Sequence, residues 1–208
     1  MLKWVPRCEM IPEGPSQIDR LLRARGFEDP AAAQSFLHPS RDQLGDPFRM
    51  PGMREAVERI TRAREMGRTV VIYGDYDVDG VTATALLTSF LTAWGIRALH
   101  YIPSRHREGY GLNAEAIRKI SAESDGAMMI TVDCGVTAVE EIALAAQLGL
   151  DPIVTDHHRP GDALPDCPVL NPLLGYPYPH LCGAGVAFKL CQALEDALRA
   201  DAGPLPAR

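Results

Sequence analysis

Hydrophobic residues along this chain form short unbroken runs that alternate with longer amphipathic segments. Four largely apolar runs have the length and composition of strands buried in a sheet: 70–73, 98–102, 127–132 and 153–155. Segments in which apolar residues recur at helical spacing predict five helices: 55–66, 81–94, 114–121, 138–148 and 185–200. The alternation of strand and helix predicts an α/β fold with a Rossmann-like parallel sheet flanked by helices.

The first fifty residues have a different pattern, which predicts a short helical lead-in. Ser16 can cap a first helix that ends at Gly26, and Asp29-Pro30 can open a second helix through residue 37. A segment rich in Gly and Pro then leads into the alternating region. We therefore expect three parts: a helical N-terminal region at 1–52, the α/β domain at 53–202 and a linker or tail at 203–208.

Composition narrows the class of protein. The chain has 208 residues and a net charge of −6, which argues against a protein that coats nucleic acid through bulk charge but permits a local basic track. The longest apolar segment, 81–94, is too short to cross a membrane and is interrupted by Thr and Ser. The chain is therefore not expected to associate with a membrane. Five cysteines without a CxxC pair predict a reduced, cytoplasmic protein.

Acidic and histidine side chains follow three of the predicted strands. Because the carboxyl ends of parallel strands meet at one edge of a sheet, these side chains should converge there. Such a group of carboxylates repels itself unless cations neutralise it. Asp and His ligands suit a pair of Mn²⁺ or Mg²⁺ ions, the usual arrangement for displacement at phosphorus. The residues concerned are Asp75, Asp77, Asp79, Asp133, Asp156, His157 and His158.

Each part of this pattern has a simpler interpretation. The segment from Asp75 to Gly80 matches the start of an EF-hand loop, but Leu86 stands where that loop needs Glu, so a calcium loop is rejected. One of the aspartates could merely cap the following helix, Asp133 could be a turn residue, and the two histidines could lie in a solvated loop. The convergence of all three clusters at equivalent strand ends favours a metal site.

Longer stretches of sequence resemble a known superfamily. Asp77-Val78-Asp79-Gly80, Thr131 to Gly135 and Thr155 to His158 resemble the first three motifs of the DHH phosphoesterases. Within that superfamily, segments 71–84, 101–112 and 183–190 are similar to the RecJ family of single-strand-specific exonucleases. The similarity extends over nearly the whole chain from Phe36 onward.

The resemblance implies a role for each residue of the cluster. Asp77 would bind one metal ion, Asp79 the other, and Asp133 would bridge them. His157 would complete the second site, and His158 would contact the scissile phosphate. In addition, two acidic residues would orient ligands or water: Asp75 and Asp156.

The same resemblance implies that the substrate is single-stranded DNA, hydrolysed from its 5′ end to 5′-mononucleotides. It also implies a role in recombination and repair, with other repair or replication proteins as partners. Arg105, Arg107 and Tyr110 follow a predicted strand and are expected to contact a phosphate and a base, although a solvated loop is the simpler interpretation. Gly183 and Gly185 precede a helix and could offer amides to a phosphate, or could permit close backbone packing.

DHH enzymes supply one further aspartate from a strand beyond the last helix. After Leu190 the acids of this chain are Glu195, Asp196 and Asp201, and none of them follows an apolar strand. We therefore expect an N-terminal portion of a longer protein, with a metal site that lacks one ligand. Two alternatives stay open: a phosphodiesterase of short oligonucleotides or cyclic dinucleotides, and a non-catalytic nucleic-acid-binding scaffold. A family-II pyrophosphatase is disfavoured because Tyr73 occupies the position of a His in those enzymes.

Overall fold

The structure, a computed structural model, describes residues 16–104, 111–124 and 126–201. The chain divides into two compact units, Met1–Gly45 and Asp46–Arg208. Each unit has its own local contacts and is considered separately.

The first unit contains the two helices that the sequence predicts. Helix α1 (Gln17–Ala24) begins at a capping box in which the Ser16 hydroxyl accepts the Asp19 N–H and the Asp19 carboxylate accepts the Ser16 N–H. Helix α2 (Pro30–Leu37) is capped by Asp29 and precedes a short 3₁₀ helix, η1 (Arg41–Gln43). Satisfied amides at both helix starts explain why the cap residues predict these helices correctly.

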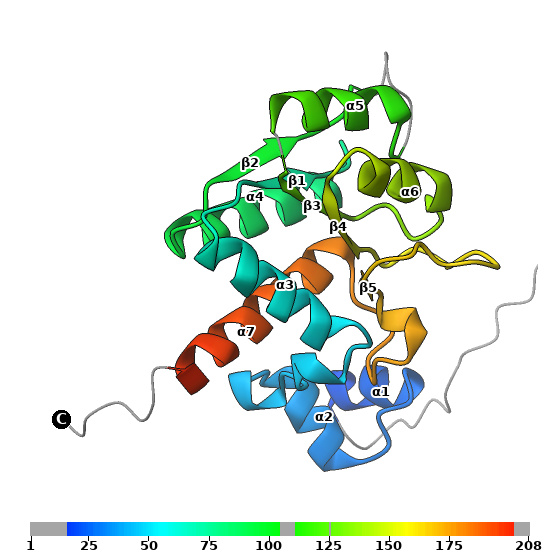
Figure 1. Cartoon of the computed structure of the whole chain (residues 1–208). Coiled ribbons are helices and arrows are strands. Elements are labelled where there is room, and N and C mark those ends of the chain that lie inside the picture. Colours follow the sequence, from blue (N-terminus) through cyan, green and yellow to red (C-terminus); the bar gives the residue numbers. More distant parts are fainter. Residues whose placement is uncertain (1–15, 105–110, 125, 202–208) are drawn as a thin grey trace, which may run out of the picture. The chain divides into compact units, whose positions relative to one another are not determined.

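The second unit is built on a five-stranded parallel sheet (Figure 1). Every adjacent pair of strands in the order β2-β1-β3-β4-β5 is parallel, which confirms the predicted fold class. The short strand β5 was not predicted from the sequence. The strands are β1 (Val70–Tyr73), β2 (Ala98–Tyr101), β3 (Met128–Val132), β4 (Asp151–Thr155) and β5 (Val169–Leu170).

Helices cover both faces of this sheet. Side chains that alternate along β1 enter two separate cores: Ile72 packs in one and Val71 in the other. The first core contains residues of α3 (Met53–Glu65), α4 (Val78–Ala93) and α7 (Gly183–Asp201). The second contains residues of α5 (Ala114–Glu123) and α6 (Val139–Gln147). Two further 3₁₀ helices are η2 (Pro47–Arg49) and η3 (Pro172–Leu174).

The strand order indicates where on the sheet a ligand would bind. Strand β1 has β2 on one side and β3 on the other, so the chain direction across the sheet reverses there. In such sheets ligands bind outside the carboxyl ends of the strands at this switch point. The loops that follow β1 and β3 carry the first two acidic clusters. Among the described residues, no helix is both long enough and apolar enough to cross a membrane.

Three helices start earlier than the sequence indicated: α3, by two residues, and two helices that carry predicted site residues, α4 and α7. Helix α4 begins at Val78 rather than at residue 81, because the Asp77 carboxylate caps it by accepting the Gly80 N–H at 2.9 Å. Helix α7 begins at Gly183 rather than at residue 185. Both shifts bring predicted site residues into the first turn of a helix, where backbone amides lack partners within the helix.

Candidate metal centre

The loop between β1 and α4 carries three aspartates at different depths. Asp75 is buried, Asp77 is exposed at the helix cap and Asp79 lies half-buried in the first turn of α4. Gly80 allows this compact turn, because a Cβ at that position would lie 2.6–2.8 Å from atoms of Asp75. Side-chain oxygens of Asp75 and Asp77 lie within 4.8 Å of one another and of an Asp133 oxygen, which is close enough for a shared cation.

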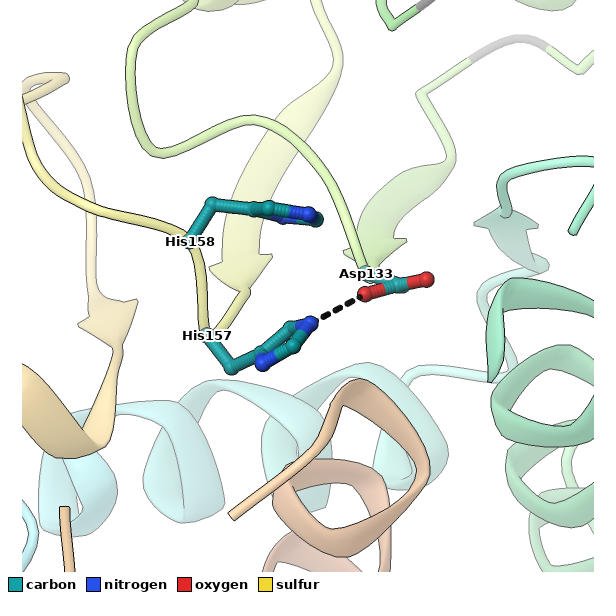
Figure 2. A group of neighbouring side chains, drawn as sticks. All are labelled: Asp133, His157 and His158. Atoms are coloured by element: carbon teal, nitrogen blue, oxygen red, sulfur yellow. Dashed lines mark ion pairs between the residues drawn. The ribbon is translucent and has the colours of Figure 1, made fainter. Parts of the chain in front are cut away.

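Asp133, at the end of β3, is the central residue of the cluster. Its side chain is only 1% exposed, and its backbone adopts a φ of 61°, the left-handed region that side-chain-bearing residues seldom occupy. Neither of its carboxylate oxygens accepts a hydrogen bond from the described residues. The Nε2 of His157 lies 3.1 Å from Oδ1 (Figure 2). A buried carboxylate without hydrogen-bond donors is the position that a cation would stabilise most.

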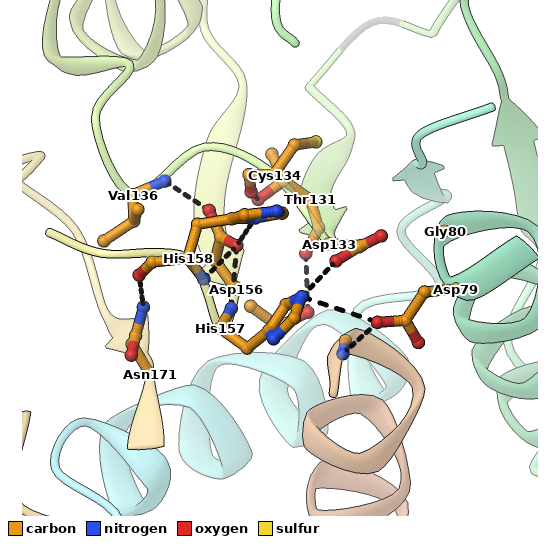
Figure 3. Close-up of polar contacts among 12 residues, drawn as sticks. Asp79, Gly80, Thr131, Asp133, Cys134, Val136, Asp156, His157, His158 and Asn171 are labelled. Atoms are coloured by element: carbon orange, nitrogen blue, oxygen red, sulfur yellow. Dashed lines mark hydrogen bonds and ion pairs between the residues drawn. The ribbon is translucent and has the colours of Figure 1, made fainter. Parts of the chain in front are cut away.

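The loop after β4 is organised by Asp156. One oxygen of this buried carboxylate accepts the Val136 N–H, and the other accepts the N–H groups of His157 and His158 and lies 2.8 Å from the His158 Nδ1 (Figure 3). These bonds fix the backbone of both histidines and the ring of His158. Ring nitrogens of His157 and His158 lie within 4.8 Å of one another and of an Asp133 oxygen, so they form a second possible ligand group.

Asp79 is held by the N-terminus of α7. Its two oxygens accept the N–H groups of Gly183 at 2.6 Å and Ala184 at 2.8 Å, and the Cys182 thiol also hydrogen-bonds to it. The His157 Nε2 is 3.5 Å from the same carboxylate. In Figure 3 the start of α7 lies directly against Asp79. The helix amides thus fix one face of this carboxylate.

The electrostatics of the cluster favour a cation. Burial, followed by the charges of Asp79 and Asp77, raises the pKa of Asp133 to about 7. Burial also opposes ionisation of Asp79, but the Ala184 and Gly183 amides outweigh it and lower the pKa of that carboxyl. For His158, burial is outweighed by the hydrogen bond and charge of Asp156, so its pKa is raised. The negative charges of Asp79 and Asp77 thus disfavour ionisation of Asp133, and a bound cation would offset that repulsion.

The structure brings all seven predicted strand-end residues to one edge of the sheet. Asp75 lies closer to the ligand cluster than expected, since it shares a group with Asp77 and Asp133. Asp79 is placed in neither three-residue group and contacts α7 instead. Arg105, Arg107 and Tyr110 lie outside the described residues.

A cleft of about 360 Å³ lies beside this cluster. Asp156 and His158 line it, together with the loop around Gly135 and Thr137 and with Glu141 of α6. It is one place where a substrate could approach His158.

Sequence reasoning missed several supporting contacts. Two of them are the hydrogen bond from the Val136 N–H to Asp156 and the one from the Cys182 thiol to Asp79. No sequence motif predicts these bonds, because each joins segments that are far apart in the sequence. The sequence offers the amides of Gly183 and Gly185 either to a phosphate or to close backbone packing. In the structure the Gly183 N–H, together with that of Ala184, donates to Asp79, a contact that neither interpretation included.

Comparison with known proteins gives a consistent result. The family model described as "DHH family, N-terminal domain" matches residues 69–206. The single-stranded-DNA-specific exonuclease RecJ of Bacillus subtilis is 46% identical over 178 residues, which cover 84% of this chain and 22% of the relative. RecJ of Escherichia coli is 35% identical over 198 residues, covering 92% and 33%. The chain therefore spans about a fifth to a third of the length of these relatives.

Solved structures agree with the sequence relatives. A crystal structure of RecJ from Thermus thermophilus in complex with Mn²⁺ has a TM-score of 0.69 and 34% identity, covering 85% of this chain and 24% of that one. A structure of exonuclease RecJ bound to manganese has a TM-score of 0.67 and 39% identity, covering 72% and 38%. The family model covers well over half of the chain, and the chain belongs to the DHH family.

Proposed function

We propose that the protein of which this chain forms the whole or a part is a metal-dependent exonuclease, which hydrolyses single-stranded DNA from the 5′ end to 5′-mononucleotides. The observation that carries this proposal is the buried Asp133 carboxylate, which accepts no hydrogen bond from the described residues and lies between two groups of possible ligands. The similarity to exonucleases named as specific for single-stranded DNA supports the choice of substrate.

The donor set fits a pair of Mn²⁺ or Mg²⁺ ions. Asp133 belongs to both ligand groups, so it suits a bridging position. Asp77 would serve one ion, and Asp79 with His157 the other, since the His157 Nε2 lies 3.5 Å from the Asp79 carboxylate. Two such ions, when bound, offset the carboxylate charge, activate water and stabilise displacement at phosphorus. The similarity to RecJ structures solved with Mn²⁺ or Mg²⁺ supports this choice.

The remaining residues of the cluster would bind and orient. Asp156 holds the His158 ring by its Nδ1, which directs the ring toward Asp133 and favours the protonated form. A protonated imidazole in that position can donate to a phosphate oxygen. Asp75, buried beside the Asp77 group, would orient a ligand or a water molecule. The cleft beside His158 would admit the nucleotide that is cleaved.

We place this activity in recombination and repair, in a reducing compartment such as the cytoplasm. The four described cysteines are free thiols, which suits that compartment. We propose that Arg105, Arg107 and Tyr110 contribute to binding of the strand, with other repair or replication proteins as partners. We also propose that residues 53–202 form the catalytic domain and 1–52 a helical lead-in.

The direct test is nucleotide release from single-stranded DNA. This chain, and a longer form of the protein if the gene continues, are incubated with 5′-labelled and 3′-labelled strands and with a duplex, in Mn²⁺, Mg²⁺ or EDTA. We expect stepwise release of labelled mononucleotide from the 5′ end of the single strand only, and none in EDTA. Asp133→Ala should abolish release, whereas Asp162→Ala, which alters an exposed aspartate after the His157-His158 loop, should not.

Other outcomes lead to other functions. Cleavage confined to dinucleotides or cyclic dinucleotides would identify a phosphodiesterase of short substrates. Binding of single strands without hydrolysis in any metal would identify a scaffold. Either result would overturn the exonuclease proposal.

A further inference from the structure

We propose that Gly183 is a positioning residue for the metal centre, which holds Asp79 through its backbone N–H and makes room for Asp133 by lacking a side chain. This inference rests on the proposed metal-dependent function but concerns a residue that is not itself a ligand. It assigns α7, which is distant in sequence from both aspartates, a direct part in the geometry of the site.

The first observation is the hydrogen-bonded clamp on Asp79. The Gly183 and Ala184 N–H groups donate to different oxygens of one carboxylate, at 2.6 and 2.8 Å. Each carboxylate oxygen has a second lone pair, so it can accept an amide and still bind a cation. Hydrogen bonds of this kind fix the orientation of a ligand before the metal arrives. Asp79 therefore cannot rotate without losing both bonds.

The second observation is the absence of space beside Asp133. A Cβ added at Gly183 would lie 2.5 Å from the Asp133 Oδ1 and 2.7 Å from its Cβ and Cγ. These distances are far below a normal van der Waals contact, and the atoms concerned belong to a short, buried side chain. Any side chain at position 183 must therefore displace Asp133 or push the start of α7 away from Asp79.

The two observations concern the same residue and two different ligands. The backbone φ of Gly183 is not positive, so glycine is required here for space and not for conformation. Alanine would even favour the helix, because its intrinsic helix propensity exceeds that of glycine. The clash of a substitution at this position therefore falls on the metal centre itself, whatever stability is lost with it.

Gly185 provides a matched control in the same turn of α7. A Cβ at Gly185 would meet only side-chain atoms, at 3.3 Å or more: those of Leu181 and the thiol of Cys182. Its backbone φ is likewise not positive. Gly185→Ala therefore makes the same chemical change two residues away, and its contact with the Cys182 thiol that bonds to Asp79 is an ordinary van der Waals contact at 3.8 Å.

The first experiment measures Mn²⁺ binding by the loss of the free-ion EPR signal, in the wild type, Gly183→Ala and Gly185→Ala. We expect Gly183→Ala to weaken Mn²⁺ binding by about 10- to 100-fold, the usual effect of losing an orienting contact. Gly185→Ala should stay within about twofold of the wild type, since no orienting contact is lost. Equal affinity in all three proteins would overturn the proposal.

Where a form of the protein is active, the dependence of its nuclease rate on Mn²⁺ concentration separates a positioning role from a purely structural one. The loss of rate in Gly183→Ala should shrink as the Mn²⁺ concentration rises, because excess metal compensates for a displaced ligand. A defect that is independent of metal concentration would contradict a positioning role.

A second experiment uses the unaltered protein, in case Gly183→Ala does not fold. Amide signals of Gly183 and Ala184 are followed by NMR during titration with Mg²⁺. We expect both signals to move on saturation, because their acceptor becomes a metal ligand. If the Asp133 signal moves and these two do not, Asp79 is not coupled to the metal and the proposal fails.

The two proposals can fail separately. Mn²⁺ binding that depends on Gly183, in a protein that hydrolyses no single-stranded DNA, would remove the exonuclease and leave the positioning role. A wild-type protein that binds neither Mn²⁺ nor Mg²⁺ would overturn both.

Discussion

Asp133 combines three features that oppose folding in the absence of a cation. It is buried, its backbone lies in the left-handed region, and its carboxylate accepts no hydrogen bond from the described part of the chain. Strain of this kind persists only where the surrounding structure enforces it, and it is concentrated at functional sites. The strand β3 and the bond from its N–H to the Thr155 carbonyl hold Asp133 in place.

Replacement of Asp133 by Asn should stabilise the metal-free protein and remove its response to metal. Asn tolerates positive φ, so the change removes charge without new backbone strain. Folding raises the pKa of Asp133 from 3.8 to about 7, so the native state is destabilised as pH rises through that interval, by roughly 4 kcal/mol at most. Melting in EDTA should show Asp133→Asn at least about 4 °C more stable than wild type at pH 8.

The difference between the two proteins should shrink as pH falls and disappear below about pH 3, where the wild-type carboxyl is protonated in both the folded and the unfolded state. Mn²⁺ at pH 8 should raise the melting temperature of the wild type and of Asp162→Asn, but not of Asp133→Asn. A metal-free Asp133→Asn that melts below the wild type at pH 8 would show that the carboxylate charge does not destabilise the fold.

Asp156 should set the protonation of His158. The Nδ1 of His158 lies 2.8 Å from this buried carboxylate, and the raised pKa of the imidazole depends on that contact. Asp156→Asn should therefore lower the pKa of His158 in the metal-free protein, as followed by NMR of its ring protons. In the wild type, this His stabilises the fold at low pH, and its contribution is lost as pH rises through the raised pKa. Identical titration curves in the two proteins would contradict this role.

At the scale of elements, strands were easier to predict than the contacts between them. The apolar run at β1 has no alternation, which indicates burial on both faces, and the structure has the same bounds for it. Strand β5 has two residues, Val169–Leu170, too few to carry a pattern of its own. The early start of α4 depends on the Asp77 cap, whose signal was weighed only as an alternative to a metal ligand.

The convergence of the strand ends could be predicted because it follows from topology. The clamp between α7 and Asp79 could not, because it joins residues 104 positions apart and leaves no trace in spacing. Nor could the spacing show that Asp75 lies with Asp77 and Asp133, since its depth depends on the tight turn at Gly80.

The first turn of α4 should be intolerant of any side chain at Gly80. A Cβ there would lie 2.6 Å from the Asp75 carbonyl oxygen and 2.7 Å from the Asp75 Cβ. Gly80→Ala should therefore lower the free energy of unfolding by about 1–3 kcal/mol, as overpacking does, despite the better helix propensity of alanine. Urea unfolding in EDTA measures this without a contribution from metal.

Gly185→Ala is the control for Gly80→Ala as well, because both positions are third in their helices. It should unfold at the same urea concentration as the wild type or a higher one. Comparable losses in the two variants would mean that the close approach to Asp75 is not what Gly80 provides.

At the scale of the whole molecule, every described residue of the metal cluster belongs to the second unit. The sheet, both cores and the three strand-end loops lie within Asp46–Arg208, whereas the first unit is formed by Met1–Gly45. Among the described residues, the ligand groups and the elements that carry them all belong to this unit.

A chain that begins at Asp46 should fold and bind metal by itself. Both faces of its sheet are covered by its own helices, and every buried residue of the two core clusters lies at Met50 or beyond. We expect a cooperative thermal transition in the truncated chain and a rise in melting temperature with Mn²⁺ equal to that of the full chain, because the same ligands are present. Asp133→Asn in the truncated chain should cancel that rise. A truncated chain that melts cooperatively but no longer responds to Mn²⁺ would show that the first unit takes part in the metal centre, and the ligand set drawn from the three strand ends would then be incomplete.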